Sequence, residues 1–276
     1  MDTLNTSESH FNTSPPRSLY HYTDALVDIL ESKEIWASKV QCLNDSQEIK
    51  RALNLARKNL KELIRHNQSM QSIQELEGMI WDIEHYESVN IFAASFTGSG
   101  DSVSQYDRYG RYAIGFTSKS LAVAGSNSWR FHLAQCVYDE KRQTELVRYA
   151  IRRGLPAGVR VDDIWPPFSL GNLESVIQDS FTNALVTVAP LIKDPIFKTE
   201  SEWRLVSLNC QLLEKYRTGK TGNVPYFPLP LADDGVVEVV IGRGPEQRRA
   251  YDCATALSDR LAMGFSVRLS ELVPPG

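Results

Sequence analysis

Glu200 and Glu202 lie two residues apart in the segment from Phe197 to Val206, at the start of an apolar run. In a β-strand, side chains two residues apart point to the same face at a spacing of ~7 Å, so both carboxylates and Arg204 would project together. Two acids on one face can divide a reaction, because one can stabilise a developing positive charge while the other handles a proton. The alternative is a solvated surface strand with a Glu–Arg pair worth at most ~1 kcal/mol.

The composition excludes several classes of protein. The chain has 276 residues, of which 42% are hydrophobic, and this predicts a soluble globular protein with a real core. The formal net charge of −4 gives no overall attraction to nucleic acid or to anionic membranes. No apolar run approaches the ~20 residues that cross a bilayer, and the first residues do not resemble a secretory signal. The 4 scattered cysteines predict buried thiols in a reducing compartment, so we expect a cytoplasmic protein without a membrane segment.

Hydrophobic periodicity predicts a single domain that follows a flexible N-terminal arm over residues 1–17. Strands are expected near 18–22, 34–38, 89–96, 112–116, 131–138, 203–208, 236–241 and 266–269. Helices are expected near 23–33, 45–65, 73–85, 141–153, 173–188 and 246–261. This irregular order favours an α+β domain with antiparallel sheets over a doubly wound parallel sheet. The proline-containing segment 223–231 is expected to be an extended crossing within the domain.

The segment that begins at Leu43 predicts a helix with a basic surface. Asp45 followed three residues later by Glu48 resembles a capping box, and Asn44 could help to cap the same helix. The basic residues of this helix are Lys50, Arg51, Arg57, Lys58, Lys61 and Arg65. Such a face is usually just solvated, but it could also contact the phosphates of a nucleic acid.

Three parts of the chain, in order, resemble the ADP-ribosyltransferase superfamily. They are the aromatic-histidine strand from Tyr20 to Thr23, the Ser/aromatic segments of the middle, and the late Glu200-x-Glu202. The chain is also similar to a large, poorly characterised bacterial family. That family's pattern runs from His-Tyr-Thr through Leu-Asn-Asp-x-x-Glu and Ser-x-Ser-Gln-aromatic-x-x-Tyr-Gly to Glu-x-Glu-Trp-Arg. These motifs match residues 21–23, 43–48, 102–110 and 200–204 here, so the resemblance covers residues 18 to 206.

The resemblance implies a fold, a substrate and a biological setting. The implied fold is an ADP-ribosyltransferase-like split antiparallel β-sandwich over residues 18–276, with helical insertions near 45–88 and 170–190. The implied substrate is NAD, and the reaction is mono-ADP-ribosylation of a macromolecule by a bacterial toxin or phage-defence effector. Nucleic acid, including RNA, is slightly favoured over protein as the acceptor because of the basic helix. An antitoxin or chaperone is a further expected partner.

The resemblance also implies roles for three catalytic residues. Glu202 would stabilise the oxocarbenium-like ribosyl cation and hold a ribose hydroxyl. His21 would donate a hydrogen bond to the nicotinamide ribose, and Glu200 would orient or deprotonate the acceptor. Trp203 points to the other side of the strand and is expected in the core. The middle slot of the superfamily pattern has no single obvious residue.

Further residues are candidates for binding NAD. The aromatic candidates that would sandwich the nicotinamide ring are Tyr22, Trp36, Tyr106 and Tyr109. Thr23 and Ser95 would add polar contacts. Arg108 and Arg111 would reach the pyrophosphate. No metal is expected at this site.

Two other classes of function fit the same residues. One is a metal-dependent nuclease that uses Asp45, Glu48 and Asp101 as ligands of a divalent metal. The other is a non-catalytic interaction module, in which the aromatic and acidic residues form a surface for a partner.

Overall fold

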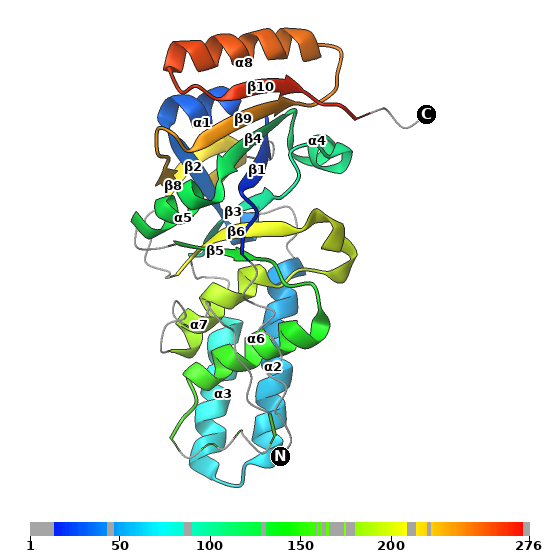
Figure 1. Ribbon diagram of the computed structural model, residues 1–276. Coiled ribbons are helices and arrows are strands. Elements are labelled where there is room, and N and C mark those ends of the chain that lie inside the picture. Colours follow the sequence, from blue (N-terminus) through cyan, green and yellow to red (C-terminus); the bar gives the residue numbers. More distant parts are fainter. Residues whose placement is uncertain are drawn as a thin grey trace, which may run out of the picture.

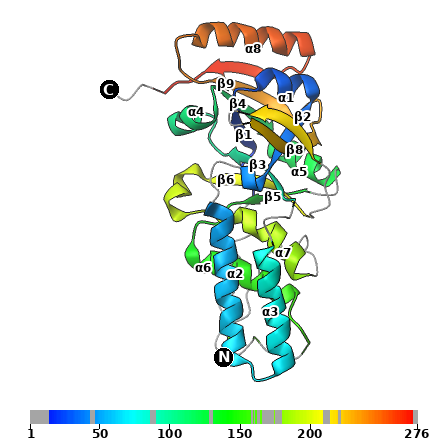
Figure 2. The ribbon, with the colours of Figure 1, turned by 180° about the vertical axis from the view of Figure 1, so that it is seen from behind.

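Ten strands form one mixed sheet, with helices at both ends of the molecule (Figures 1 and 2). The computed structural model describes residues 14–42, 47–85, 90–127, 131–157, 159, 161, 164–165, 174, 180–208, 214–219 and 222–272. The strands are β1 (Ser18–Thr23), β2 (Glu34–Lys39), β3 (Phe92–Thr97), β4 (Tyr112–Thr117), β5 (Phe131–Gln135), β6 (Glu202–Ser207), β7 (Lys215–Gly219), β8 (Gly222–Pro230), β9 (Val236–Ile241) and β10 (Ser266–Leu269). The α-helices are α1 (Leu26–Ser32), α2 (Gln47–His66), α3 (Met70–Glu84), α4 (Val103–Tyr109), α5 (Ser118–Asn127), α6 (Glu140–Arg153), α7 (Phe181–Val188) and α8 (Gln247–Leu261). The described part of the chain also contains the short 3₁₀ helices η1 (Val40–Cys42), η4 (Ala189–Leu191) and η5 (Pro195–Glu200).

Most elements expected from the periodicity are present, with ends shifted by a few residues. Helices α4 and α5 were not expected, because their apolar residues are too few to show a helical period. The helix expected near 173–188 is seen as α7, which begins at Phe181; residues 175–179 lie outside the described residues. The mixed α and β content agrees with the expected α+β class.

The proline-containing segment forms a strand, which corrects the expected crossing. Strand β8 pairs with β2 through residues 226–230 and with β7 through residues 222–226. In a strand, the N–H groups of successive residues point to opposite edges. The N–H of Leu231 points toward β2, because it donates to the backbone oxygen of Lys33, just before β2. The nitrogens of Pro228 and Pro230 therefore face the other edge, beyond the reach of β7. Proline is tolerated there because the ladder needs no donor from it.

Strand β3 is the branch point of the sheet. Along one edge it pairs with β6 from Ala93 to Thr97. Along its other edge, Ala93 pairs with Ser38 of β2, whereas Thr97 pairs with Tyr20 of β1. Strands β1 and β2 therefore meet opposite ends of β3 and separate in between, at Ser95. This separation divides the sheet into a wing of β1, β4, β9 and β10 and a wing of β2, β8 and β7.

The two faces of β3 and β6 pack against different cores. Ala94 and Leu205 belong to the core that the sheet shares with α1 and α8. Their neighbours Ala93 and Val206 face the helices α2, α3, α6 and α7. Figure 1 shows these four helices together at the end of the molecule opposite to α8. Because a strand alternates its faces, β3 and β6 each supply side chains to both cores.

Helix α2 has the expected amphipathic pattern. Its buried residues include Ala52, Leu53, Ala56, Leu60 and Leu63. On its basic side, Arg51 is paired with Asp194 at 2.6 Å. The expected capping residues Asn44 and Asp45 lie outside the described residues. Within the described part of the chain, no helix combines the length and apolar character needed to cross a membrane.

Candidate active site

A cleft of about 810 Å³ opens where β1 and β2 separate along β3. A recess of about 50 Å³ adjoins it and shares His21, Tyr22, Ser95, Tyr109 and Glu202 with its lining. These residues come from β1, from β3 and the nearby α4, and from β6, three parts of the chain that are far apart in the sequence. The fold thus brings His21 and Glu202, predicted from distant motifs, into one cleft.

Glu202 is held in a buried network of charges. Its Oε1 accepts a hydrogen bond from Arg204 Nε at 2.6 Å, and its Oε2 accepts one from Lys193 Nζ. Arg204 also pairs with Glu48 at 2.7 Å, at the first turn of α2. Burial alone would raise the pKa of Glu202, but Arg204 and Lys193 outweigh it and lower this pKa to about 2. Glu202 is therefore a carboxylate at neutral pH, and it cannot act there as a general acid.

Glu200 reaches the same place from a different element than expected. Strand β6 begins at Glu202, and Glu200 is the last residue of η5. Ser201 between them has a left-handed backbone, with φ of 43°. This kink, rather than strand alternation, turns Glu200 toward Lys193, which it contacts at 2.5 Å. Every residue of β6 is buried, so the alternative of a solvated surface strand is wrong.

His21 has a tautomer that its neighbours determine. Its Nδ1 lies 2.9 Å from the backbone oxygen of Ser95, the residue of β3 left between β1 and β2. A carbonyl oxygen can only accept, so Nδ1 carries the proton and the neutral ring presents a bare Nε2. Burial lowers the pKa of His21, and the nearby Arg217 lowers it further. His21 therefore offers an acceptor to the cleft, not the donor that we expected.

The four aromatic candidates occupy different positions. Tyr22, Trp36 and Tyr109 line the cleft. Tyr106 packs edge-on against Tyr22, with ring centroids 4.9 Å apart, and its hydroxyl donates to Gly100. It lies behind Tyr22 and does not line the cleft or the recess. Gly110, directly after α4, lies close to the end of β1, where a Cβ would be 2.5 Å from the backbone of Thr23.

The polar candidates are also divided. Thr23 and Ser95 line the cleft, although Thr23 Oγ1 accepts a hydrogen bond from Ala25. Arg108 lines the cleft but pairs with Glu200 at 3.0 Å. Arg111 lines a separate hollow and lies 3.8 Å from Asp24. Trp203 is buried in the core, as expected.

Three further residues of the site were missed by sequence reasoning. Lys193 bridges the two glutamates, and its backbone is fixed by hydrogen bonds with Val137 and Gln143. Gln105, a buried residue of α4, lines the recess together with Glu202. Arg217 lines the cleft from β7. Gln105 lay within a motif that had been noticed, whereas Lys193 and Arg217 carry no local signal.

The two described residues of the nuclease hypothesis, Glu48 and Asp101, have different partners. Glu48 is paired with Arg204 in the cleft, whereas Asp101 accepts hydrogen bonds from Ser270 and the backbone of Glu271. The third ligand, Asp45, lies outside the described residues. Within the described ranges, no group of three or more His, Cys, Asp or Glu residues is placed to hold a metal ion.

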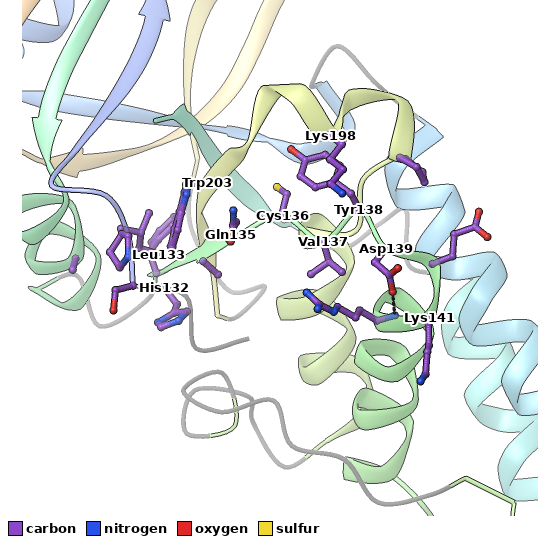
Figure 3. A pocket seen from close by; sticks show the side chains of 18 of the residues that line it. His132, Leu133, Gln135, Cys136, Val137, Tyr138, Asp139, Lys141, Lys198 and Trp203 are labelled. Carbon is purple, nitrogen blue, oxygen red and sulfur yellow. Dashed lines mark hydrogen bonds between the residues drawn. The ribbon is translucent and has the colours of Figure 1, made fainter. Parts of the chain in front are cut away.

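A larger hollow of about 1050 Å³ lies along β5 and the start of α6 (Figure 3). Figure 3 shows it extending from Trp203 and His132 past Cys136 and Tyr138 to Lys141. Burial raises the pKa of the Cys136 thiol, so this cysteine is not an activated nucleophile. His132, whose pKa is lowered by burial, and the acids Asp139 and Glu140 line this hollow. Asp139 accepts a hydrogen bond from the backbone N–H of Arg142, and Glu140 is exposed, so neither acid is buried as Glu202 is in the cleft. The cleft therefore remains the better candidate for an active site.

The chain was compared with known proteins by sequence and by structure. No family model, curated protein or solved structure matches it. The function must therefore be inferred from the cleft and its residues.

Proposed function

We propose that this protein is an NAD-dependent mono-ADP-ribosyltransferase with its active site in the cleft between β1 and β2. The observation that carries the proposal is that His21 and Glu202 line one cleft, together with Trp36 and Tyr109. A sheet that splits at β3 also suits the ADP-ribosyltransferase-like split β-sandwich that the motifs imply. The helices α2 and α3, and the helix α7, would then belong to the insertions expected near 45–88 and 170–190.

The proposed reaction breaks the bond between C1′ of the ribose and the nicotinamide nitrogen. The bonding electrons leave with neutral nicotinamide, and C1′ acquires oxocarbenium character until an acceptor atom forms the new bond and loses its proton. A fixed carboxylate beside C1′ stabilises this cation electrostatically. Glu202 fits this role because it is ionised, buried and immobilised by Arg204 and Lys193.

Two other groups would position the substrate. The bare Nε2 of His21 would accept a hydrogen bond from a ribose hydroxyl. Tyr109 and Trp36 would supply apolar surface for the nicotinamide ring. Glu200 is ion-paired with Lys193 and Arg108, and it would take the acceptor proton only if these contacts loosen.

The acceptor is proposed to be a macromolecule, with nucleic acid favoured over protein. The basic side chains of α2 support this choice, because the first turn of that helix reaches the cleft through Glu48. Cys42, Cys136 and Cys253 are free thiols, which suits a chain that acts in the reducing cytoplasm as a toxin or defence effector. An antitoxin or chaperone partner belongs to the same proposal.

Labelled NAD tests the proposal directly. The protein is incubated with NAD carrying the label on its adenylate, in separate pools of RNA, DNA and cell protein. We expect label in one pool from the wild-type chain and at least ~100-fold less from Glu202→Gln, because the positive charge at C1′ loses its counter-charge. Glu246→Gln is the matched control, because Glu246 is an exposed glutamate at the start of α8.

The proposal predicts a specific pattern of results. Nicotinamide should be released together with transfer, and Glu246→Gln should transfer at the wild-type rate. Label transfer that persists unchanged in a folded Glu202→Gln protein would contradict the assigned role of Glu202. No transfer from the wild-type chain to any pool, with no nicotinamide release, would contradict the function itself.

A further inference from the structure

Arg217 places a positive charge on the wall of the cleft without a carboxylate beside it. Every other cation that lines this cleft is neutralised, since Lys193 and Arg204 pair with Glu202 and Arg108 pairs with Glu200. Among the described residues, Arg217 forms no ion pair. A half-buried charge without a counter-charge is unfavourable, so its presence needs an explanation.

The contacts of Arg217 hold the guanidinium in place but leave most of its donors unused. One nitrogen, Nη2, donates to Ser38 Oγ at 3.1 Å, and the group lies 5.2 Å from the centre of the Trp36 ring. The Nε of Arg217 is buried without a hydrogen-bond partner, and so is Nε1 of Trp36. A guanidinium has five N–H donors. A residue selected only for stability would satisfy more of them.

The support behind Arg217 is rigid. Ser38 pairs with Ala93 of β3 on one side and with Tyr226 of β8 on the other. The Trp36 ring lies against Tyr226, with centroids 5.5 Å apart. Because the guanidinium stacks on one fixed group and bonds to another, it is preorganised to receive a ligand.

We propose that Arg217, held by Ser38 and Trp36, is the phosphate-binding group of the cleft. Guanidinium groups bind phosphate through paired N–H···O contacts. The negative charge of the phosphate would neutralise Arg217, which has no carboxylate partner among the described residues. The assignment of this phosphate to the pyrophosphate of NAD rests on the proposed function. The cleft has a volume of about 810 Å³, which falls in the range of ligand sites and leaves room for more than one phosphate. Arg217 takes the role expected for Arg108, whose charge Glu200 already neutralises.

Binding measurements test this proposal without relying on catalysis. Isothermal titration of the full chain with inorganic pyrophosphate, with ADP-ribose and with a short RNA oligonucleotide separates the sources of phosphate. We expect Arg217→Met to weaken pyrophosphate and ADP-ribose binding by about tenfold or more, from the loss of charge-assisted hydrogen bonds. Arg248→Met is the matched control, because Arg248 also stacks on an aromatic ring, Tyr251 at 5.0 Å, far along the chain on α8.

Two further measurements guard against a folding defect. The melting temperature of Arg217→Met without ligand should equal or exceed that of the wild type, because an uncompensated charge is removed. Arg217→Lys keeps the charge but not the paired donors, so it should bind pyrophosphate with intermediate affinity.

Each outcome decides one point. Equal pyrophosphate affinity in wild type and folded Arg217→Met, or no binding by the wild type, would overturn the phosphate site. Binding of pyrophosphate but not ADP-ribose, or Arg217-dependent binding of RNA alone, would keep the site and overturn its assignment to NAD. Arg217-dependent ADP-ribose binding without any label transfer would keep the phosphate site while the proposed function fails.

Discussion

Lys193 and Glu202 form an ion pair at the inner wall of the cleft, and both side chains are almost completely buried. The ammonium of Lys193 also contacts Glu200, and Glu202 also binds Arg204. Lys193 follows η4, Glu200 ends η5, and Glu202 and Arg204 belong to β6. Each buried charge is tolerable only because its partner is in place. The network therefore couples the fold around the site to the position of the candidate catalytic carboxylate.

Removing Lys193 should destabilise the protein strongly. Lys193→Met leaves Glu200 and Glu202 close together without their shared cation, and breaking a buried pair of this kind costs ~3–5 kcal/mol. Urea denaturation measures the loss. Lys198→Met, an exposed lysine on η5, should change the free energy of unfolding by only ~0.5 kcal/mol. Equal stability of the two variants would show that the network contributes little.

The conformation of Ser201 predicts an asymmetric response to substitution. A left-handed backbone suits glycine and is strained for β-branched residues. Ser201→Gly should therefore be neutral or slightly stabilising, whereas Ser201→Val should cost ~1–2 kcal/mol. Thermal unfolding measures both. The valine variant should also transfer less ADP-ribose than the glycine variant, because the kink aligns Glu200 with Glu202; equal transfer by two folded variants would argue against this.

Two substitutions at His21 separate its structural and functional roles. In His21→Asn, the amide nitrogen can replace Nδ1 as a donor to Ser95, but nothing replaces Nε2. His21→Leu loses both, and it leaves the carbonyl of Ser95 without this partner at a cost of ~1–3 kcal/mol. We expect both variants to lose transfer activity but only the leucine variant to lose stability. An asparagine variant with full activity would remove His21 from the proposed mechanism.

The pH dependence of stability has two expected windows. Burial lowers the pKa of His21 and of His132 below 6.5, so the unfolded chain binds more protons as the pH falls through that value. Stability should therefore decrease below pH 6.5, and less steeply in His21→Asn. The Glu202 carboxyl has its pKa lowered from 4.5 to about 2, so its contribution is complete above pH 4.5 and is lost toward pH 2. Urea midpoints across pH 2–8 measure both windows.

Local patterns predicted many of the elements, but not how they converge. Periodicity located β1, β2 and α2, because each buries residues at its own spacing. Periodicity missed β8. A strand can contain prolines only where their nitrogens face an unpaired edge, and which edge of β8 is unpaired depends on the positions of β2 and β7.

The same limit applies to the candidate site. Motif order indicated His21 and Glu202, and both line the cleft. Lys193 and Arg217 could not be predicted, because their importance comes from partners that are distant in the sequence. Glu200 does not share a strand with Glu202 as expected, because the left-handed backbone of Ser201 separates them. The residue type of Ser201 does not reveal this conformation.

Tyr106 and Tyr109 should differ in what their loss affects. Tyr106 packs against Tyr22 and lies close to Gly242, so Tyr106→Ala should remove these contacts and cost ~1–3 kcal/mol, because the ring is only partly buried. Tyr109 lines the cleft, and Tyr109→Ala should instead weaken NAD binding with a smaller loss of stability. Urea denaturation and titration with NAD, performed on both variants, measure this contrast. If Tyr106→Ala weakened NAD binding more than Tyr109→Ala in folded protein, the nicotinamide ring would have to be placed beside Tyr106 instead.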